Sequence, residues 1–401
     1  MNNPRNITNT SSEISLGWRT WLIILIDFII CIIFYMFVPY LASYFNHALG
    51  YSTSLIGVIL AVRLISQQGL AMIGGSLADQ FGYKKIAILG FIIRGVGFAG
   101  MGTTTNVTLI LLYAFLSGAG GAMFSPVIKI LIAVFTPSEK YKESYSLLHM
   151  AENAGAILGP TLGLFIHQDQ FVVLSLIAGI VFCLIGVSFL FIHDIPSPSK
   201  SMSWRKSSIQ IIQNPFFLFF TFMMIPYHAI YQQIYISIPL TAERLTGSSG
   251  WLFPLMTLMI ILFQWPVTQY FKEKSWNQTL FAAYFCLSLT FIVMGMSSKI
   301  WSIIFGLAGI AFATMTLLPA YQTYIAKMAA HGSLGAYFGF SYIAAAIGGA
   351  LGNVLGGMLY SYFSDINKPE WLWTTFALLC LISAFGCIAY RSLSKTPYSD
   401  Y

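Results

Sequence analysis

The chain has 401 residues, of which 57% are hydrophobic and only 8% charged, and its mean hydropathy is +0.76. Because a soluble domain carries roughly 25% charged residues, this composition excludes a water-soluble surface and predicts an all-α integral membrane protein. The net charge of +7 is spread over short loops, which excludes a nucleic-acid-binding patch. The five cysteines lie far apart inside apolar runs, so we interpret them as buried hydrophobes rather than disulfides or metal ligands.

Polar and turn-forming clusters divide the sequence into about twelve membrane-spanning helices. We expect them at Trp18–Tyr44, Ser52–Leu77, Lys85–Gly102, Val107–Phe135, Tyr145–His167, Phe171–Ile192, Pro215–Leu240, Gly250–Phe271, Thr279–Met296, Ile300–Ala326, Leu334–Phe363 and Trp371–Arg391. The expected domains are an N-terminal tail (1–17), a first six-helix half (18–192), a polar linker (193–213), a second six-helix half (214–391) and a C-terminal tail (392–401). The run from Trp18 is too long for a signal-peptide core, so we expect an uncleaved first span.

Lysine and arginine placement predicts the orientation of the spans. With both termini inside, the cytoplasmic loops and tails hold fourteen of the 20 basic residues and the opposite side holds three. The remaining three, Arg63, Arg94 and Lys129, lie within spans. We therefore expect a multi-pass membrane protein with both termini and the linker in the cytoplasm.

A short basic turn separates the second and third spans. It contains Gly75, Asp79, Gly82, Lys84 and Lys85 in the order G-x-x-x-D-x-x-G-x-K-K. This turn resembles the signature loop between helices two and three of the major facilitator superfamily. Other stretches that resemble the superfamily are Gly57–Gly69, Arg94–Ala99, Leu116–Gly121 and Tyr337–Gly349. Within the superfamily the chain is most similar to the bacterial drug:proton antiporters of twelve helices, which implies a fold of two six-helix halves and transport by alternating access.

The resemblance also implies a gating role for this loop. Asp79 is expected to face the N-terminal end of span eleven, near Gly335, because a helix N-terminus carries about half a positive charge. Lys84 and Lys85 are expected to face the cytoplasmic membrane surface. The motif's arginine after Asp79 is Gln80 here, and the equivalent loop of the second half, residues 270–274, has lost the motif.

Glycine runs repeat in the two halves. Residues 155–163 and 348–356 share the same glycine spacing, which places span five on span eleven and supports two related halves. In span five the positions are Gly155, Gly159, Pro160 and Gly163, which resemble the antiporter motif. We expect the proline and glycines to bend this helix and pack it against the opposite half; generic close packing is the alternative.

Several charged residues lie at bilayer depth, where each requires a partner or a role. Asp27, Arg94 and Glu152 are each expected about nine residues from the cytoplasmic end of a span, roughly 13 Å deep. With Arg63 they form two acids and two bases that can pair internally. We expect Glu152, or otherwise Asp27, to couple transport to protons, with His149 one helical turn away as a relay. A static salt bridge is the alternative for each carboxylate, and hydrogen-bonded packing is the alternative for His149.

Aromatic and amide side chains are expected to line a central cavity with adaptable walls. The candidates are Tyr35, Gln67, Gln68, Tyr227, His228, Tyr231, Gln232, Gln264, Trp265, Tyr321 and Gln322. Their aromatic faces would attract organic cations, although helix packing is the alternative for each one. Other tryptophans, Trp18, Trp21, Trp371 and Trp373, are expected at the membrane interface or facing lipid.

These features predict a proton-coupled exporter of small amphiphilic compounds that works as a monomer in the lipid bilayer. The alternatives are an exporter or uptake symporter for one metabolite, such as a siderophore, an amino-acid derivative or a sugar, or a sensor that does not transport. The sequence has no phosphate-binding loop, no H-E-x-x-H and no nucleophile elbow. We therefore expect a small-molecule substrate and protons as partners, but no enzyme activity, no cofactor, no metal and no nucleic acid.

Overall fold

The computed structural model describes residues 16–51, 53–163, 170–192, 204–246, 251–297, 299–329 and 332–393. They form helices joined by short turns: α1 (Trp18–Ser43), η1 (Tyr44–Ala48), α2 (Thr53–Gly69), α3 (Ala71–Phe81), α4 (Tyr83–Thr103), α5 (Val107–Phe135), η2 (Ser138–Lys140), α6 (Tyr141–Gly163), α7 (Phe171–Phe191), α8 (Trp204–Ile212), α9 (Pro215–Phe222), α10 (Ile225–Tyr231), η4 (Gln232–Ile234), α11 (Ser237–Thr246), α12 (Leu252–Phe271), α13 (Trp276–Met296), α14 (Ile300–Met328), α15 (Leu334–Asp365) and α16 (Glu370–Leu393).

Most predicted spans are confirmed to within a few residues. By length and composition, eight helices within the described ranges can cross a membrane alone, and up to ten if each bent pair is one span. Helix α6 carries several charges along its length, and α16 has a shorter apolar stretch, Glu370–Gly386. Helix α6 packs against α1, and α16 packs against α13. We therefore count α6 and α16 as the remaining two predicted spans.

Two predicted spans are not continuous helices. The second bends by 43° between α2 and α3. The seventh is divided into α9, α10, η4 and α11, and Pro226 stands in the first turn of α10, where it lacks a backbone N–H for an intrahelical bond. The linker also contains the short helix α8, which the sequence analysis did not predict and which meets the seventh span at 80°.

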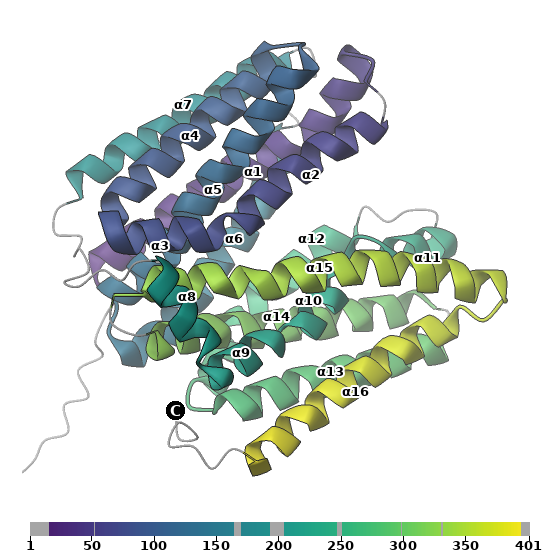
Figure 1. Cartoon of the computed structure of the whole chain (residues 1–401). Helices are drawn as coiled ribbons and strands as arrows, with labels where there is room; N and C mark the ends of the chain where they lie inside the picture. Colours follow the sequence, from purple (N-terminus) through teal and green to yellow (C-terminus); the bar gives the residue numbers. More distant parts are fainter. Residues whose placement is uncertain are drawn as a thin grey trace, which may run out of the picture.

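The helices form two bundles, α1–α7 and α9–α16, which we call the first and second halves (Figure 1). The halves meet through α3 with α15 and through α6 with α12 and α14. In Figure 1 they join where α3, α8 and the start of α15 lie, and they diverge toward the opposite end, where α11 lies. Helix α8 packs across the junction against both α3 and α15.

Gly155 and Gly159 of span five contact α1 within their own half, whereas α6 packs against α12 and α14 of the opposite half nearer its start, around Lys142 and Ser146. A Cβ at Gly155 would lie 2.6 Å from Cys31 Cβ, and one at Gly159 would meet the backbone of α1 in the same way. The matching glycines Gly348 and Gly352 of α15 contact α10. Each half therefore repeats one tight helix pair, α6 on α1 and α15 on α10, and this repetition accounts for the shared spacing.

Helix starts follow local sequence signals. Asn106 accepts hydrogen bonds from the N–H groups of Thr108 and Leu109 at the start of α5, and Ser275 with Gln278 forms a capping box on α13. Among the tryptophans, Trp18, Trp21 and Trp371 are exposed, as expected. Trp373 is only 4% exposed and stacks on Phe291, so it faces the interior of its bundle and not the lipid.

Candidate functional site

The carboxylate of Asp79 joins the two halves. Asp79 lies near the end of α3 and is 1% exposed. Its Oδ1 accepts a hydrogen bond from the N–H of Gly335 at 2.9 Å, and its Oδ2 accepts one from the N–H of Ala336 at 3.0 Å. The hydroxyl of Tyr83 donates to Oδ1 as well, at 3.2 Å. A carboxylate of the first half thus caps the positive N-terminus of α15.

Close backbone contact supports this capping interaction. Gly75 and Gly335 face each other so closely that a Cβ on either one would collide with the other's carbonyl oxygen. Gly82 has a φ of 96°, which favours glycine, and it ends α3 so that α4 can begin at Tyr83. The loop glycines therefore set the distance at which Asp79 reaches α15.

A second connection lies beside the first and has the opposite polarity. Lys142, at the start of α6, donates from Nζ to the carbonyl oxygens of Phe271, Lys272 and Lys274 at 3.0, 3.1 and 2.7 Å. Glu143, which is buried, binds the ammonium of Lys272 at 2.6 Å. A cation of the first half thus neutralises the negative C-terminal end of α12.

We call the part of the molecule that holds the Asp79 and Lys142 connections the latched end. Lys84 also lies near it, but its Nζ donates to the carbonyl oxygens of Leu190 and Ile192 at 2.8 and 3.1 Å. It therefore caps the end of α7 within the first half, and its place at the cytoplasmic membrane surface stays a prediction. Lys85 is exposed, as that prediction requires.

Two carboxylates at bilayer depth, the buried Asp27 and the partly exposed Glu152, lie around a lysine. Glu152 contacts His149, with 2.6 Å between Oε2 and Nδ1, and its side chain is 30% exposed. Asp27 is buried, and its Oδ2 has no hydrogen-bond partner among the described residues. Both carboxylates interact electrostatically with Lys129 of α5. The Lys129 ammonium in turn lies 5.2 Å from the ring centroid of Tyr342, which belongs to α15 in the second half.

The arginines do not pair with these carboxylates. Within the described residues, no ion pair joins Arg63 or Arg94 to Asp27 or Glu152. The expectation that the four charges neutralise one another directly is therefore wrong. The cation that approaches the acids is Lys129, and the two guanidinium groups lie against aromatic rings instead.

The predicted cavity residues divide into two groups, according to whether they lie between the two halves. The partly exposed ones are Tyr35, Gln67, Gln68, His228, Tyr231 and Gln232. Tyr35 of α1 lies close enough to Tyr231 and Tyr235 of the second half to interact with them electrostatically. These three tyrosines therefore face each other between the halves.

The remaining candidates are not placed between the halves in this way. Tyr227, Gln264, Tyr321 and Gln322 are buried, while Trp265 is exposed on α12. The Tyr227 hydroxyl donates to Thr314, the Gln264 amide donates to the Met315 carbonyl, and the Tyr321 ring stacks on Phe220. For these residues the structure shows helix packing within the second half.

Comparison with known proteins identifies the family. The sequence model of the Major Facilitator Superfamily matches residues 23–318, which is most of the chain. The chain belongs to the major facilitator superfamily. Multidrug resistance protein MdtH of Salmonella choleraesuis is 25% identical over 384 residues, which cover 93% of this chain and 94% of the relative.

Solved structures of the superfamily have the same fold. The Escherichia coli fucose:proton symporter FucP has a TM-score of 0.78 at 15% identity, covering 95% of this chain and all of that one. A structure of FucP in the outward conformation has a TM-score of 0.76 at 14% identity, with 94% and 99% covered. The predicted fold of two six-helix halves is therefore confirmed. The protein is a multi-pass membrane transporter of small molecules and not an enzyme.

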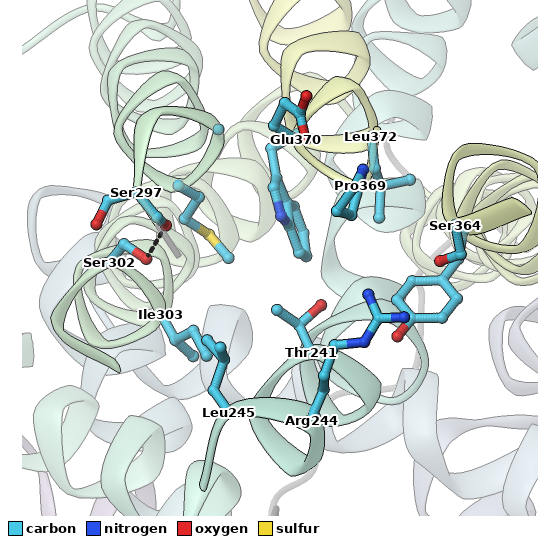
Figure 2. A pocket seen from close by; sticks show the side chains of 14 residues that line it. Thr241, Arg244, Leu245, Ser297, Ser302, Ile303, Ser364, Pro369, Glu370 and Leu372 are labelled. Atoms are coloured by element: carbon cyan, nitrogen blue, oxygen red, sulfur yellow. Dashed lines mark hydrogen bonds between the residues drawn. The ribbon is translucent and has the colours of Figure 1, made fainter. Parts of the chain in front are cut away.

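A separate hollow of this major facilitator protein lies within the second half, on α11, α13, α14, α15 and α16 (Figure 2). Arg244 of α11 and Glu370 of α16 line it on different sides, and Ser302 donates to the Ser297 carbonyl at 2.8 Å. Its volume is about 150 Å³. Pockets for drug-sized molecules measure roughly 300–1,000 Å³, so this hollow is too small for the transported compound. In the described ranges, no three His, Cys, Asp or Glu side chains gather as metal ligands would.

Sequence reasoning missed several residues of this transporter's site. Lys129 was recognised as the only base of its span but was not counted with the buried charges, although the cost of charge in lipid applies to it equally. Tyr235 follows Tyr231 by one helical turn and carries the same signal. Lys142 and Glu143 gave no signal, because charged residues are ordinary in a cytoplasmic loop.

Proposed function

We propose that this protein exports small amphiphilic compounds in exchange for protons, contributing to drug or antibiotic resistance. In this proposal it is a monomer of the bacterial inner membrane, and both termini lie in the cytoplasm. The match to a multidrug resistance protein along almost its whole length supports the substrate class. The excess of lysine and arginine in the loops on one side supports the orientation.

With this orientation the latched end is cytoplasmic and the structure is the outward-facing state. Asp79 and Lys142 then hold the inner gate closed. Gly155, Gly159, Pro160 and Gly163 would keep α6 on α1, so that the first half moves as a rigid bundle. Alternating access would consist of opening the latched end while the opposite end closes.

The observation that carries proton coupling is the position of Glu152. Its carboxylate lies deep in the first half, yet its side chain is 30% exposed while the latched end is closed. In this proposal the exposed part of the carboxylate faces the space between the halves, through which a proton from the outside would reach it in this state. His149, at 2.6 Å, would relay the proton or tune its affinity.

Lys129 provides a physical link between protonation and the gate. It interacts with both carboxylates of the first half and with Tyr342 on α15, the helix that Asp79 caps. When a proton neutralises Glu152, Lys129 loses part of its attraction to the first half. The contact between Lys129 and α15 then changes, which biases the equilibrium between the two gate states.

The test uses the purified protein in proteoliposomes with an imposed pH gradient and a panel of amphiphilic dyes. Dye transport is followed by fluorescence, and internal pH is followed with trapped pyranine. We expect dye to accumulate on the acidic side, the side from which protons leave, and transport to stop when a protonophore is added. Glu152→Gln should abolish coupling at unchanged protein abundance, whereas Glu139→Gln, an exposed loop carboxylate, should not.

Two results would overturn the proposal. Dye that moves in the same direction as the protons would indicate an uptake symporter. Protonophore-insensitive transport, or undiminished coupling in Glu152→Gln, would remove Glu152 from the coupling role.

A further inference from the structure

Arg94 is a buried cation without a carboxylate. It is 3% exposed, and its guanidinium carbon lies 5.1–5.2 Å from the ring centroids of Phe34, Phe98, Phe124 and Phe182. Its Nε and Nη1 atoms have no hydrogen-bond partner among the described residues. Aromatic faces compensate part of the charge, but they leave its N–H donors unused.

Arg63 lies beside Arg94 and is likewise a buried cation without a carboxylate. It is 9% exposed, and its guanidinium carbon lies 5.1 Å from the same Phe34 ring that Arg94 contacts. Its Nη1 donates to Gln67 Oε1 at 3.3 Å, and its Nε has no partner in the described part of the chain. Two like charges therefore share one aromatic ring, and each destabilises the other.

The surrounding helices make room for these groups. A Cβ at Gly121 would collide with Arg94 Nη1 and would lie 3.1 Å from Gln67 Cδ. Because Gly121 has no side chain, α5 can pack closely against α2 and α4 while the Arg94 guanidinium and the Gln67 amide occupy the space beside Gly121. Gln67 and Tyr35 are both partly exposed, and Tyr35 interacts electrostatically with Arg63 and with tyrosines of the second half. Donor groups from α2 and α4 and the Tyr35 hydroxyl of α1 therefore gather at one place.

The buried charges of the first half are separated by sign. The carboxylates Asp27 and Glu152 have Lys129 and His149 as neighbours. The guanidinium groups have neighbours that carry no negative charge, apart from the thiol of Cys31 and the phenol of Tyr35 in their rare ionised forms. A desolvated pair of arginines in this arrangement lacks an anion.

We propose that Arg63, with Arg94 behind it, binds an anionic group of the transported molecule, such as a carboxylate or sulfonate. Guanidinium donors in a fixed fork match a carboxylate in two-point geometry. The site therefore selects amphiphiles that carry an anionic group, rather than the purely cationic compounds that aromatic walls alone would suggest. This inference rests on the proposed function, because it names the substrate class of the same transporter.

The experiment compares two dyes that share one xanthene body. Rhodamine B carries a free carboxylate, and its ethyl ester does not. Their binding to the purified protein in nanodiscs is measured by fluorescence anisotropy, with no pH gradient, so that binding is tested apart from proton-driven export. We expect rhodamine B to bind about 10-fold more tightly than the ester, the difference made by one good charge-assisted contact.

Variants at Arg63 test the assignment. Arg63→Gln should abolish the preference for the carboxylate while leaving ester binding unchanged, and Arg63→Lys should retain part of it. Lys299→Gln, which removes an exposed cation at the far end of the second half, should change neither affinity. Monodisperse size-exclusion profiles exclude misfolding of the variants.

Equal affinity for the two dyes, no binding of either one, or a preference that survives Arg63→Gln would overturn the inference. Failure of the proposed function has a different signature. In that case rhodamine B would bind selectively through Arg63, but its movement across the membrane would not depend on the pH gradient.

Discussion

Asp79 and Gly335, 256 residues apart in the chain, are joined by a hydrogen bond of 2.9 Å between the Asp79 carboxylate and the Gly335 backbone N–H. The bond places a full negative charge of the first half at the positive N-terminus of α15 in the second half. The Lys142 ammonium at the end of α12 is the complementary arrangement. Both connections use a helix terminus of the second half and a side chain of the first, so both break when the halves separate at this end.

The first prediction concerns the charge of Asp79. Asp79→Asn keeps the shape of the side chain but removes its charge, which weakens the latch by about 1 kcal/mol, or roughly fivefold in the ratio of gate states. Spin labels on Ser138→Cys and Lys327→Cys, both exposed and at the latched end, measure the separation by electron–electron resonance. The variant should add a second, longer distance. The control variant Asp365→Asn, at the opposite end of α15, should leave the distance distribution unchanged. An unchanged distribution in Asp79→Asn as well would contradict the role of Asp79 in holding the gate closed.

The second prediction concerns Lys142. Lys142→Met keeps the aliphatic stem but removes the three hydrogen bonds to carbonyl oxygens. It should increase the same long-distance population as Asp79→Asn, because the two connections stabilise one gate state. The double variant should open the latched end more than either single variant. If Lys142→Met has no effect alone or in combination, the contact at α12 does not contribute to gating.

The third prediction concerns the close contact of Gly75 with Gly335. Gly75→Ala introduces a Cβ that collides with the Gly335 carbonyl, so the latched end cannot close fully. We expect slower dye export and increased labelling of cysteines placed on the inner side of the gate. Gly357→Ala is the matched control, since nothing lies within 4 Å of its Cβ position on α15. It should retain export or improve stability slightly.

The fourth prediction concerns Lys129 and Tyr342. Tyr342→Leu removes the ring that Lys129 contacts at 5.2 Å while leaving both carboxylates in place. We expect dye binding to be retained and fewer protons to move per dye molecule, because protonation no longer biases α15. Tyr342→Phe keeps the ring and should lie closer to the wild type. Equal coupling in the leucine variant and the wild type would show that the link does not pass through this pair.

The sequence predicted the helices of this fold well, because long apolar runs and basic loops carry strong signals. Breaks inside spans were not predicted, since residues 215–240, which hold α9, α10 and the start of α11, are apolar along most of their length. The contact of Asp79 with α15 was expected from a motif with a defined partner. The contacts of Lys142 were not, because a lysine that binds backbone carbonyl oxygens leaves no trace in the partner's side chains.

Pairing inside the membrane was the least predictable feature. Equal numbers of acids and bases suggested salt bridges, but the rotation of α2 and α4 turns Arg63 and Arg94 toward Phe34 and away from Asp27. Likewise, the glycine run of α6 indicated a close helix contact but not which helix it meets. Which neighbouring helix a residue faces depends on how the whole bundle assembles, and the local sequence does not determine it.

In the proposed mechanism, protons and substrate cross the membrane in opposite directions and Glu152 couples the two movements. The most direct measurement records pyranine fluorescence and dye movement together in proteoliposomes loaded with rhodamine B, for the wild type, Glu152→Gln and Glu139→Gln. Protons should enter as dye leaves in the wild type and in Glu139→Gln, and should not enter in Glu152→Gln. Dye release without proton entry in the wild type, or proton entry that persists in Glu152→Gln, would contradict it.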